Sequence, residues 1–321
     1  MTSHSTTKVG ASVLAPARLH LGFLDLNGAI GRRYGSIGLA VDRPATRLSV
    51  ESAHRNTTSG PESTRAMRLL DSFTHGGAQR YAVSISETIP AHAGLGSGTQ
   101  LALAIGAAIA QLEKRPLSAT DLAVIGERGA RSGIGLAAFT QGGFIIDGGR
   151  GQSDRPPPVI LRLEFPEHWR ILLIFDNARA GVSGEAETTA FAGLPEFPNA
   201  MAAHICHLAL LKLTPGLVER DLAAFGAAIT EIQQIVGWHF AGKQGGSPWT
   251  SPTVGRLAAR MQEQGATGIG QSSWGPTGFA FVDSPEAAER LYHSLVGDAK
   301  RDGLDIAVAQ GRNAGARLET L

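Results

Sequence analysis

The residues best able to do chemistry gather in a glycine-rich stretch, Pro-Ala-His-Ala-Gly-Leu-Gly-Ser-Gly-Thr, at positions 90–99. Alternating apolar and polar residues at 81–87 predict a half-buried strand before it, and Ala- and Leu-rich residues 101–112 predict a buried helix after it. Glycines let a ligand approach the backbone, and a helix start offers unpaired N–H groups and the positive end of the helix dipole. A simple tight turn with a helix cap is the alternative. The stretch therefore predicts a phosphate or pyrophosphate site made of Gly94, Leu95, Gly96, Ser97, Gly98 and Thr99.

Two common nucleotide-binding patterns do not fit this stretch. A Walker A loop is excluded because no Gly-Lys-Ser/Thr follows the first glycine at the required spacing. A Rossmann fingerprint is not convincing, because no acidic residue ends a second strand about 20 residues further on.

Further polar residues are candidates for substrate binding or catalysis, and each has a structural alternative. Arg18 and His20 alternate with leucines, so both side chains lie on one face of a predicted strand. The alternative is that this face is simply exposed to solvent. Asp25 either orients a substrate or metal, or caps a turn. Arg33 and Arg179 lie in glycine-containing loops and are candidates for anion binding, although most surface arginines bind no ligand.

A second polar string, Gln-Ser-Ser-Trp at 271–274, follows a predicted strand at 267–271. Gln271, Ser272 and Ser273 offer neutral hydrogen-bonding groups, and Trp274 offers a ring plane that suits an aromatic substrate. The alternative for the tryptophan is a place in the core.

Composition excludes several classes of protein. The chain has 321 residues, of which 43% are hydrophobic, enough for two ordinary domains. Its net charge of +1 predicts no partner nucleic acid and no anionic membrane surface. The single cysteine, Cys206, rules out an intrachain disulfide, and the first eight residues lack the apolar core of a signal peptide. The longest apolar run is too short to span a bilayer. We expect a cytoplasmic protein.

The elements that must position these residues divide near Pro166, which predicts domains at 1–165 and 166–321. The first half predicts strands at 9–15, 18–24, 37–41, 46–52, 81–87, 144–147 and 159–165, helices at 63–75, 101–112 and 118–128, and a glycine-rich loop at 131–143. The second half predicts strands at 171–175, 267–271, 278–283 and 305–310 and helices at 200–213, 219–236 and 252–262, with a last helix opening at Ser284. Ignoring the extra helices, this order resembles a split βαβ, ferredoxin-like domain.

Three stretches resemble the motifs of the GHMP kinase superfamily, in order and approximate spacing: 15–20, 90–99 and 265–278. The resemblance implies an α+β fold, with an N-terminal domain of the ribosomal S5 domain 2 type and a C-terminal ferredoxin-like domain. Gly126-Glu127-Arg128 resembles the motif of the kinase metal-binding glutamate, but Leu136 stands where these kinases usually have an aspartate near the acceptor hydroxyl. Leucine cannot accept a proton, which weighs against kinase chemistry, although homoserine kinases in this superfamily also lack that base.

A more specific resemblance covers nearly the whole chain. The strings Pro-Ala-Arg-Leu-His-Leu-Gly-Phe-Leu-Asp at 16–25, Arg-Tyr-Gly-Ser-Ile-Gly-Leu at 33–39 and Gly-Gln-Ser-Ser-Trp-Gly-Pro-Thr at 270–277 resemble the β-ribofuranosylaminobenzene 5′-phosphate synthase family. The resemblance implies a decarboxylating ribosyl transfer from phosphoribosyl pyrophosphate (PRPP) to 4-aminobenzoate or 4-hydroxybenzoate, in tetrahydromethanopterin biosynthesis. A small-molecule kinase that uses ATP, and a catalytically silent sensor of a phosphorylated metabolite, are the alternatives.

The same resemblance implies roles for the candidate residues. Mg²⁺ is the expected cofactor, with Ser97 and Glu127, carried over from the resemblance to the kinases, as its protein ligands. The expected catalytic residues are Arg18, His20, Asp25, Gln271 and Ser272. The residues expected to bind substrate are the six loop residues 94–99 together with Arg33, Arg179, Ser273 and Trp274. The family also suggests a homodimer.

Overall fold

The computed structural model describes residues 9–153, 155–181 and 189–321. Residues 1–8, on which the expectation about a signal peptide rests, lie outside the described residues. So does part of the segment that follows Arg179, at residues 182–188.

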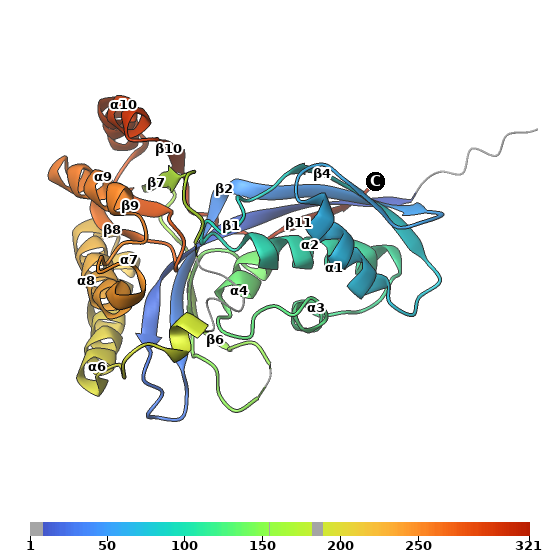
Figure 1. Ribbon diagram of the computed structural model, residues 1–321, viewed down its shortest axis with the longest axis horizontal. Helices are drawn as coiled ribbons and strands as arrows, with labels where there is room; N and C mark the ends of the chain where they lie inside the picture. The colour runs from blue at the N-terminus through green and yellow to red at the C-terminus, as the bar shows by residue number, and fades with distance from the viewer. Residues whose placement is uncertain (1–8, 154, 182–188) are drawn as a thin grey trace, which may run out of the picture.

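Two long antiparallel strands form the spine of the first sheet. β1 (Gly10–Asp25) pairs with β2 (Tyr34–Ala53), as Figure 1 shows in blue. The prediction of four shorter strands over 9–52 is wrong, because the chain continues as a strand through Pro16. The strand pairing shifts register between Pro16 and Ala17, which accommodates a residue without an N–H. The sheet runs β11-β1-β2-β4-β3, with β5 between β2 and β6. The other strands are β3 (Thr57–Ser59), β4 (Arg80–Glu87), β5 (Phe144–Asp147), β6 (Val159–Leu163) and β11 (Arg317–Thr320).

Four helices lie along one side of this sheet (Figure 1): α1 (Ser63–Thr74), α2 (Ser97–Leu112), α3 (Ala119–Ile125) and α4 (Ile134–Thr140). α2 is buried along most of its length because apolar residues occur on all its faces. The predicted capping pair Ser118 and Asp121 is confirmed as a capping box on α3.

Three expectations about these helices are wrong. Ser63 does not cap α1 but is its first residue, and α3 ends at Ile125 instead of 128. The glycine-rich segment 131–143 was expected to be a loop, but it contains α4. Burial of Ile134, Ala137 and Ala138 against the sheet stabilises this short helix, which local glycine content argued against.

The second sheet has the strand order β10-β7-β9-β8, which confirms the predicted ferredoxin-like arrangement. α9 and α10 cover one face of it, and α8 lies against the other (Figure 1). Ser251 and Ser284 cap α9 and α10, as predicted, each followed by proline at the first helical position. The strands are β7 (Arg170–Asp176), β8 (Thr267–Gln271), β9 (Gly278–Val282) and β10 (Leu304–Ala309). The helices are α6 (Asn199–Leu208), η1 (Ala209–Leu213), α7 (Thr214–Val218), α8 (Leu222–Phe240), η2 (Ala241–Lys243), α9 (Pro252–Glu263) and α10 (Pro285–Arg301).

One continuous core joins the two sheets. Leu19 and Leu21 of β1, Phe225 of α8 and Phe281 of β9 belong to the same buried cluster. β6 lies in the first sheet and β7 in the second, on either side of the predicted boundary at 166, but β11 returns from the C-terminal end to pair with β1. The halves of the chain therefore hold each other in place, and the surfaces where they meet have a defined geometry.

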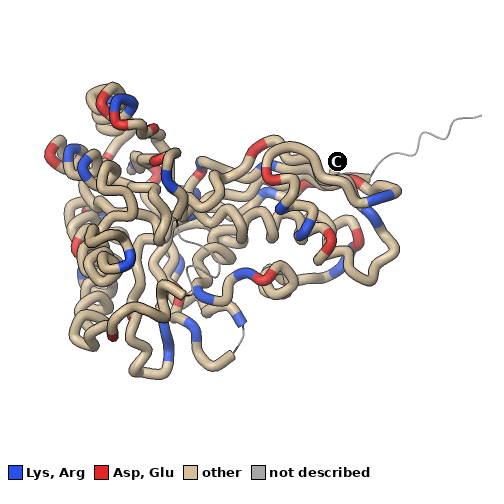
Figure 2. The backbone as a smooth tube through the Cα atoms, viewed as in Figure 1, with Lys and Arg blue, Asp and Glu red and all other residues tan. Residues whose placement is uncertain are grey.

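The helical run Asn199–Val218 is long and apolar enough to cross a membrane by length and composition alone. Its residues Ile205, Leu208, Leu213 and Leu217 pack into the main core, as they do in a core helix of a globular protein. Acidic and basic residues are interspersed over both halves of the molecule (Figure 2), in keeping with the net charge of +1.

Candidate functional site

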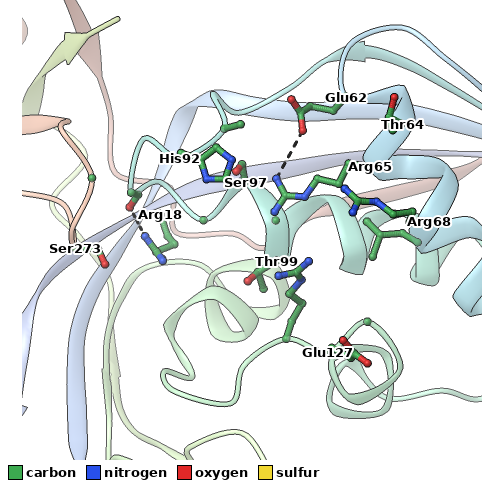
Figure 3. A pocket seen from close by; sticks show the side chains of 18 of the residues that line it. Arg18, Glu62, Thr64, Arg65, Arg68, His92, Ser97, Thr99, Glu127 and Ser273 are labelled. Atoms are coloured by element: carbon green, nitrogen blue, oxygen red, sulfur yellow. Dashed lines mark hydrogen bonds and ion pairs between the residues drawn. The ribbon is translucent and has the colours of Figure 1, made fainter. Parts of the chain in front are cut away.

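A cavity of about 950 Å³ opens where the glycine-rich loop 94–99 begins α2. α1 and the residues after α3 form its walls, together with the turn after β8 (Figure 3). A cavity of this volume is large enough for a substrate the size of a sugar diphosphate or nucleotide. The lining includes Arg18, Glu62, Arg65, Arg68, His92, Gly94, Gly96, Ser97, Gly98, Thr99, Glu127, Arg128, Ser273 and Trp274.

The loop leaves the start of α2 open to a ligand. Gly94 and Gly96 both have φ near +80°, a conformation that side-chain-bearing residues rarely adopt. A Cβ on Gly94 would overlap the carbonyl oxygen of Ser272, so the loop packs closely against the turn after β8. Gly96 is the N-cap of α2 and supplies no side-chain cap, whereas Ser or Asp side chains cap α3, α8, α9 and α10. The first N–H groups of α2 are therefore left for an anion.

Arginines surround this helix start on two sides. Arg18 donates a hydrogen bond from Nη1 to the Gly94 carbonyl, and its backbone N–H donates to Leu95 O at 3.1 Å. Across the loop, a Cβ on Gly98 would overlap the Arg65 guanidinium and lie 3.5 Å from Cζ of Arg128. In Figure 3, Arg18 and Ser273 lie on one side of Ser97, and Arg65 and Arg68 on the other.

Sequence reasoning missed Arg65, Arg68 and Arg128. With Arg18 they put four arginines in the cavity lining against two glutamates, Glu62 and Glu127, in a chain of net charge +1. Burial, followed by the nearby charge of Arg65, lowers the pKa of Arg128, and Nε of Arg128 is buried without a hydrogen-bond partner in the described part of the chain. Glu62 pairs with Arg65 at 3.7 Å, which still leaves an excess of positive charge in the cavity lining. The electrostatics therefore support a site for phosphates.

Gln271 and Ser272, two of the expected catalytic residues, are not among the cavity residues, and their side chains make structural hydrogen bonds. The Ser272 hydroxyl is fully buried; it donates to Gly94 O at 2.7 Å and accepts the His20 N–H at 3.0 Å. Gln271 accepts the Thr250 N–H at 2.7 Å and donates to Gln244 Oε1 at 2.9 Å. The Ser272 bonds join β1 and the glycine-rich loop to the turn after β8, and the Gln271 bonds hold this turn against residues 244–250. Both are therefore positioning residues.

The next two residues of this turn reach the cavity. Ser273 has φ of 57° and donates its N–H to His20 O at 3.2 Å. Trp274 is only 4% exposed, and its ring lies 4.7 Å from that of Phe191 and 4.6 Å from that of Phe240, between centroids. Both expected substrate-binding residues of the turn therefore line the cavity, and Trp274 does so from an aromatic cluster.

His20 is 3% exposed, with its ring centroid 4.4 Å from that of Phe23. Burial, together with the charges of Arg18 and Arg131, lowers the pKa of His20 to about 3. The imidazole is therefore neutral at physiological pH and too weak a base to accept a proton efficiently there.

The remaining predicted residues are spread more widely. Asp25 accepts the N–H groups of Asn27 and Gly28 through Oδ1, so its observed contacts are those of the turn-capping alternative. Arg179 is exposed, pairs with Asp176 at 3.5 Å and is not among the cavity residues. Arg33 lines a different cavity. Leu95 contributes only its backbone, because its side chain is buried.

Ser97 and Glu127, the expected Mg²⁺ ligands, line the same cavity. Within residues 9–153, 155–181 and 189–321 no group of three or more His, Cys, Asp or Glu side chains gathers to hold a metal. One hydroxyl and one carboxylate still fit Mg²⁺, which commonly takes few protein oxygens and completes its shell with phosphates and water.

The chain is similar to known protein families over most of its length. The model for the GHMP kinases N terminal domain matches residues 63–143, and the model for the GHMP kinases C terminal region matches residues 213–300. A β-ribofuranosylphenol 5′-phosphate synthase of Methanothermobacter thermautotrophicus is 33% identical, over 94% of this chain and 96% of its own length. The synthase of the same name from Archaeoglobus fulgidus is 31% identical, over 95% and 98%.

Among solved structures, a homoserine kinase from Cytophaga hutchinsonii superposes with a TM-score of 0.70 at 19% identity. The match covers 99% of this chain and all of the kinase. At this identity the likeness supports the shared fold and says nothing of the reaction.

Proposed function

The chain belongs to the family of β-ribofuranosylphenol 5′-phosphate synthases, enzymes built on the GHMP kinase fold, and from this premise we propose that it is a decarboxylating ribosyltransferase. Its substrates in this proposal are PRPP and either 4-hydroxybenzoate or 4-aminobenzoate, and its products are a β-C-riboside 5′-phosphate, CO₂ and pyrophosphate. The proposed pathway is tetrahydromethanopterin biosynthesis. The observation that carries the proposal is the uncapped start of α2 with arginines on two sides of it.

Phosphate recognition is the first task of such a site. The N–H groups at the start of α2 face the pyrophosphate, and Arg65 and Arg128 contribute two guanidinium groups beside Gly98. Negative charge grows on the pyrophosphate as its bond to the ribose breaks. Fixed donors in a partly buried cavity stabilise that charge without having to reorganise. Mg²⁺, held by Ser97 and Glu127, would supply further neutralisation of the phosphates.

The bond changes require no proton acceptor on the protein. The ring carbon that bears the carboxylate attacks C1 of the ribose as the bond from C1 to pyrophosphate breaks. The para hydroxyl or amino group donates electron density to the ring. Loss of CO₂ then leaves an electron pair that restores the aromatic ring, and attack opposite pyrophosphate inverts the α-configured substrate to a β-product. Neutral His20 and apolar Leu136 are compatible with this chemistry, because positioning and charge stabilisation provide the catalysis.

A direct assay tests the proposal. The protein is incubated with PRPP, Mg²⁺ and either benzoate labelled at its carboxyl carbon, and released CO₂ and pyrophosphate are counted. We expect equal amounts of both, and loss of about tenfold or more in kcat/KM for Arg65→Gln, the size expected when one contact to a charged group is lost. Arg290→Gln, at an exposed position of α10, is the matched control. Pyrophosphate or CO₂ release without the other, or no release with either benzoate, would contradict the proposal.

A homodimer is part of the same proposal. Large apolar side chains are exposed along α6, η1, α7 and α8, where a second copy would cover them. They are Met201, Leu210, Leu211, Val218 and Trp238. Light scattering that gives a mass near that of one chain, 33.5 kDa, would argue against it.

A further inference from the structure

A second cavity, of about 470 Å³, lies beyond the turn that joins β1 to β2. Aromatic rings and two arginines make up much of its lining. Its volume falls within the range of small-molecule sites. The residues that line it are Leu26, Asn27, Arg33, Tyr34, Arg131, Phe191, Ala192, Leu194, Pro195, Glu196, Phe197 and His239.

We infer that this second cavity binds the aromatic carboxylic acid of the reaction, with its carboxylate on Arg131 and its ring against Tyr34 and Phe191. The inference deepens the proposed function and rests on it for the identity of the reaction. It assigns Arg131, which sequence reasoning did not single out, as the residue that holds the second substrate.

The aromatic wall suits a flat ring. The centroids of Tyr34 and Phe191 are 5.6 Å apart with their planes at 78°, and Phe23 lies about 6 Å from both. Edge-to-face clusters of this kind accept a further ring in the same geometry. Asn27 donates to Glu196 Oε1 at 3.2 Å, and both line the cavity. The Glu196 carboxylate can also accept a hydrogen bond from a para hydroxyl or amino group.

Arg131 is held in place beside this wall. Its guanidinium carbon lies 4.7 Å from the centroid of the Phe191 ring, a cation–π contact. The next two residues, Ser132 and Gly133, both donate hydrogen bonds to Oδ2 of Asp147, at 3.1 and 2.8 Å. Asp147 is fully buried and also accepts the Ser36 and Gly149 N–H groups, so the loop that carries Arg131 is anchored at its base. An arginine fixed in this way can present a preorganised pair of donors to a carboxylate.

The two cavities share no lining residue, but interactions near Arg131 connect them. Its charge and that of Arg18, which lines the phosphate-binding cavity, both act on His20. The Phe191 ring below Arg131 contacts Trp274, and Trp274 lines the phosphate-binding cavity. In this inference, a carboxylate on Arg131 lies on the side of the second cavity where these interactions lead towards the phosphate-binding cavity. This is the orientation the reaction needs, because the carbon that carries the carboxylate is the one that bonds to the ribose.

Matched ligands and matched variants test the inference. Binding of 4-hydroxybenzoate and of its neutral isostere 4-hydroxybenzamide is measured by calorimetry or ligand-observed NMR, with and without pyrophosphate. Arg131→Gln should weaken benzoate binding by about tenfold or more and leave benzamide binding unchanged, because only the carboxylate forms charge-assisted bonds. Arg65→Gln, in the other cavity, should weaken PRPP binding and spare both aromatic ligands. Arg131→Lys, which keeps the charge but not the paired donors, should fall between wild type and Arg131→Gln.

The outcomes separate this inference from the proposed function. If benzoate binds in an Arg131-dependent manner while no CO₂ is released with PRPP, the aromatic acid site stands and the reaction is wrong. If CO₂ is released but Arg131→Gln leaves both benzoate affinity and KM for the benzoate unchanged, the site is wrong and the reaction stands. Equal losses of benzoate and benzamide binding in Arg131→Gln would also overturn the inference, because they would indicate a packing defect instead of a lost carboxylate contact.

Discussion

Acidification should destabilise the protein through His20. Its pKa is about 3 in the folded protein against 6.5 for an unperturbed histidine, so the unfolded chain binds a proton that the folded chain excludes. Stability from this group is fully present above pH 6.5 and is lost as pH falls from there towards the folded pKa. A pH of about 5 lies roughly 1.5 units below the pKa of the histidine in the unfolded chain. This difference corresponds to a loss of about 2 kcal/mol in the free energy of unfolding.

Urea denaturation at about pH 7.5 and about pH 5 measures this loss, and the readout is the change in unfolding free energy between the two conditions. His20→Gln removes the titrating ring, so its stability should change less with pH than that of wild type, by about 2 kcal/mol. This difference holds even though the variant is less stable at neutral pH. His54→Gln, at an exposed site, is the matched control and should follow wild type.

The same pH dependence in wild type and His20→Gln would refute the reasoning. It would mean that the folded protein can protonate His20 between Arg18 and Arg131, so that the imidazole is not held neutral by burial. A role for His20 in proton transfer near neutral pH would then have to be considered again.

Three further predictions concern phosphate binding, the stability of the glycine-rich loop and the reaction catalysed. Gly98→Ala should lower PRPP affinity by about tenfold or more in calorimetry, because a Cβ there overlaps the Arg65 guanidinium. Gly242→Ala, in open space, is the control, and equal affinity in wild type and both variants would place the phosphates elsewhere. Ser272→Ala should lower the free energy of unfolding by about 1–3 kcal/mol, because it leaves the Gly94 carbonyl and the His20 N–H without their partner. An effect no larger than that of Ser273→Ala would show that these two bonds do not stabilise the loop. ATP consumption should stay at background with sugar and mevalonate acceptors, because Leu136 provides no base, and with homoserine, because the chain belongs to the synthase family. Sustained turnover of any of them would favour the kinase alternative.

Local pattern alone determined the framework of this protein. A strand, a glycine-rich turn and an apolar helix were evident from alternation, glycine spacing and helix propensity, and Ser118, Ser251 and Ser284 marked helix starts that the structure confirms. The ferredoxin-like strand order also followed from the sequence of elements. These features depend on residues a few positions apart, which is the range over which sequence periodicity carries information.

Only the tertiary structure decided which side chains face the substrates. Arg65 and Arg68 are three residues apart on an amphipathic helix, a spacing equally typical of a solvated face, and nothing local shows that Arg128 meets Arg65 beside Gly98. Likewise, Gln271 and Ser272 have the chemistry of catalytic residues, but hydrogen bonds to distant segments use their polar groups for support. Arg131 meets Phe191 because Asp147 anchors its loop and the shared core joins the two halves. Contacts between segments far apart in the sequence depend on how sheets and helices pack, because spacing along the chain does not record which distant surfaces meet.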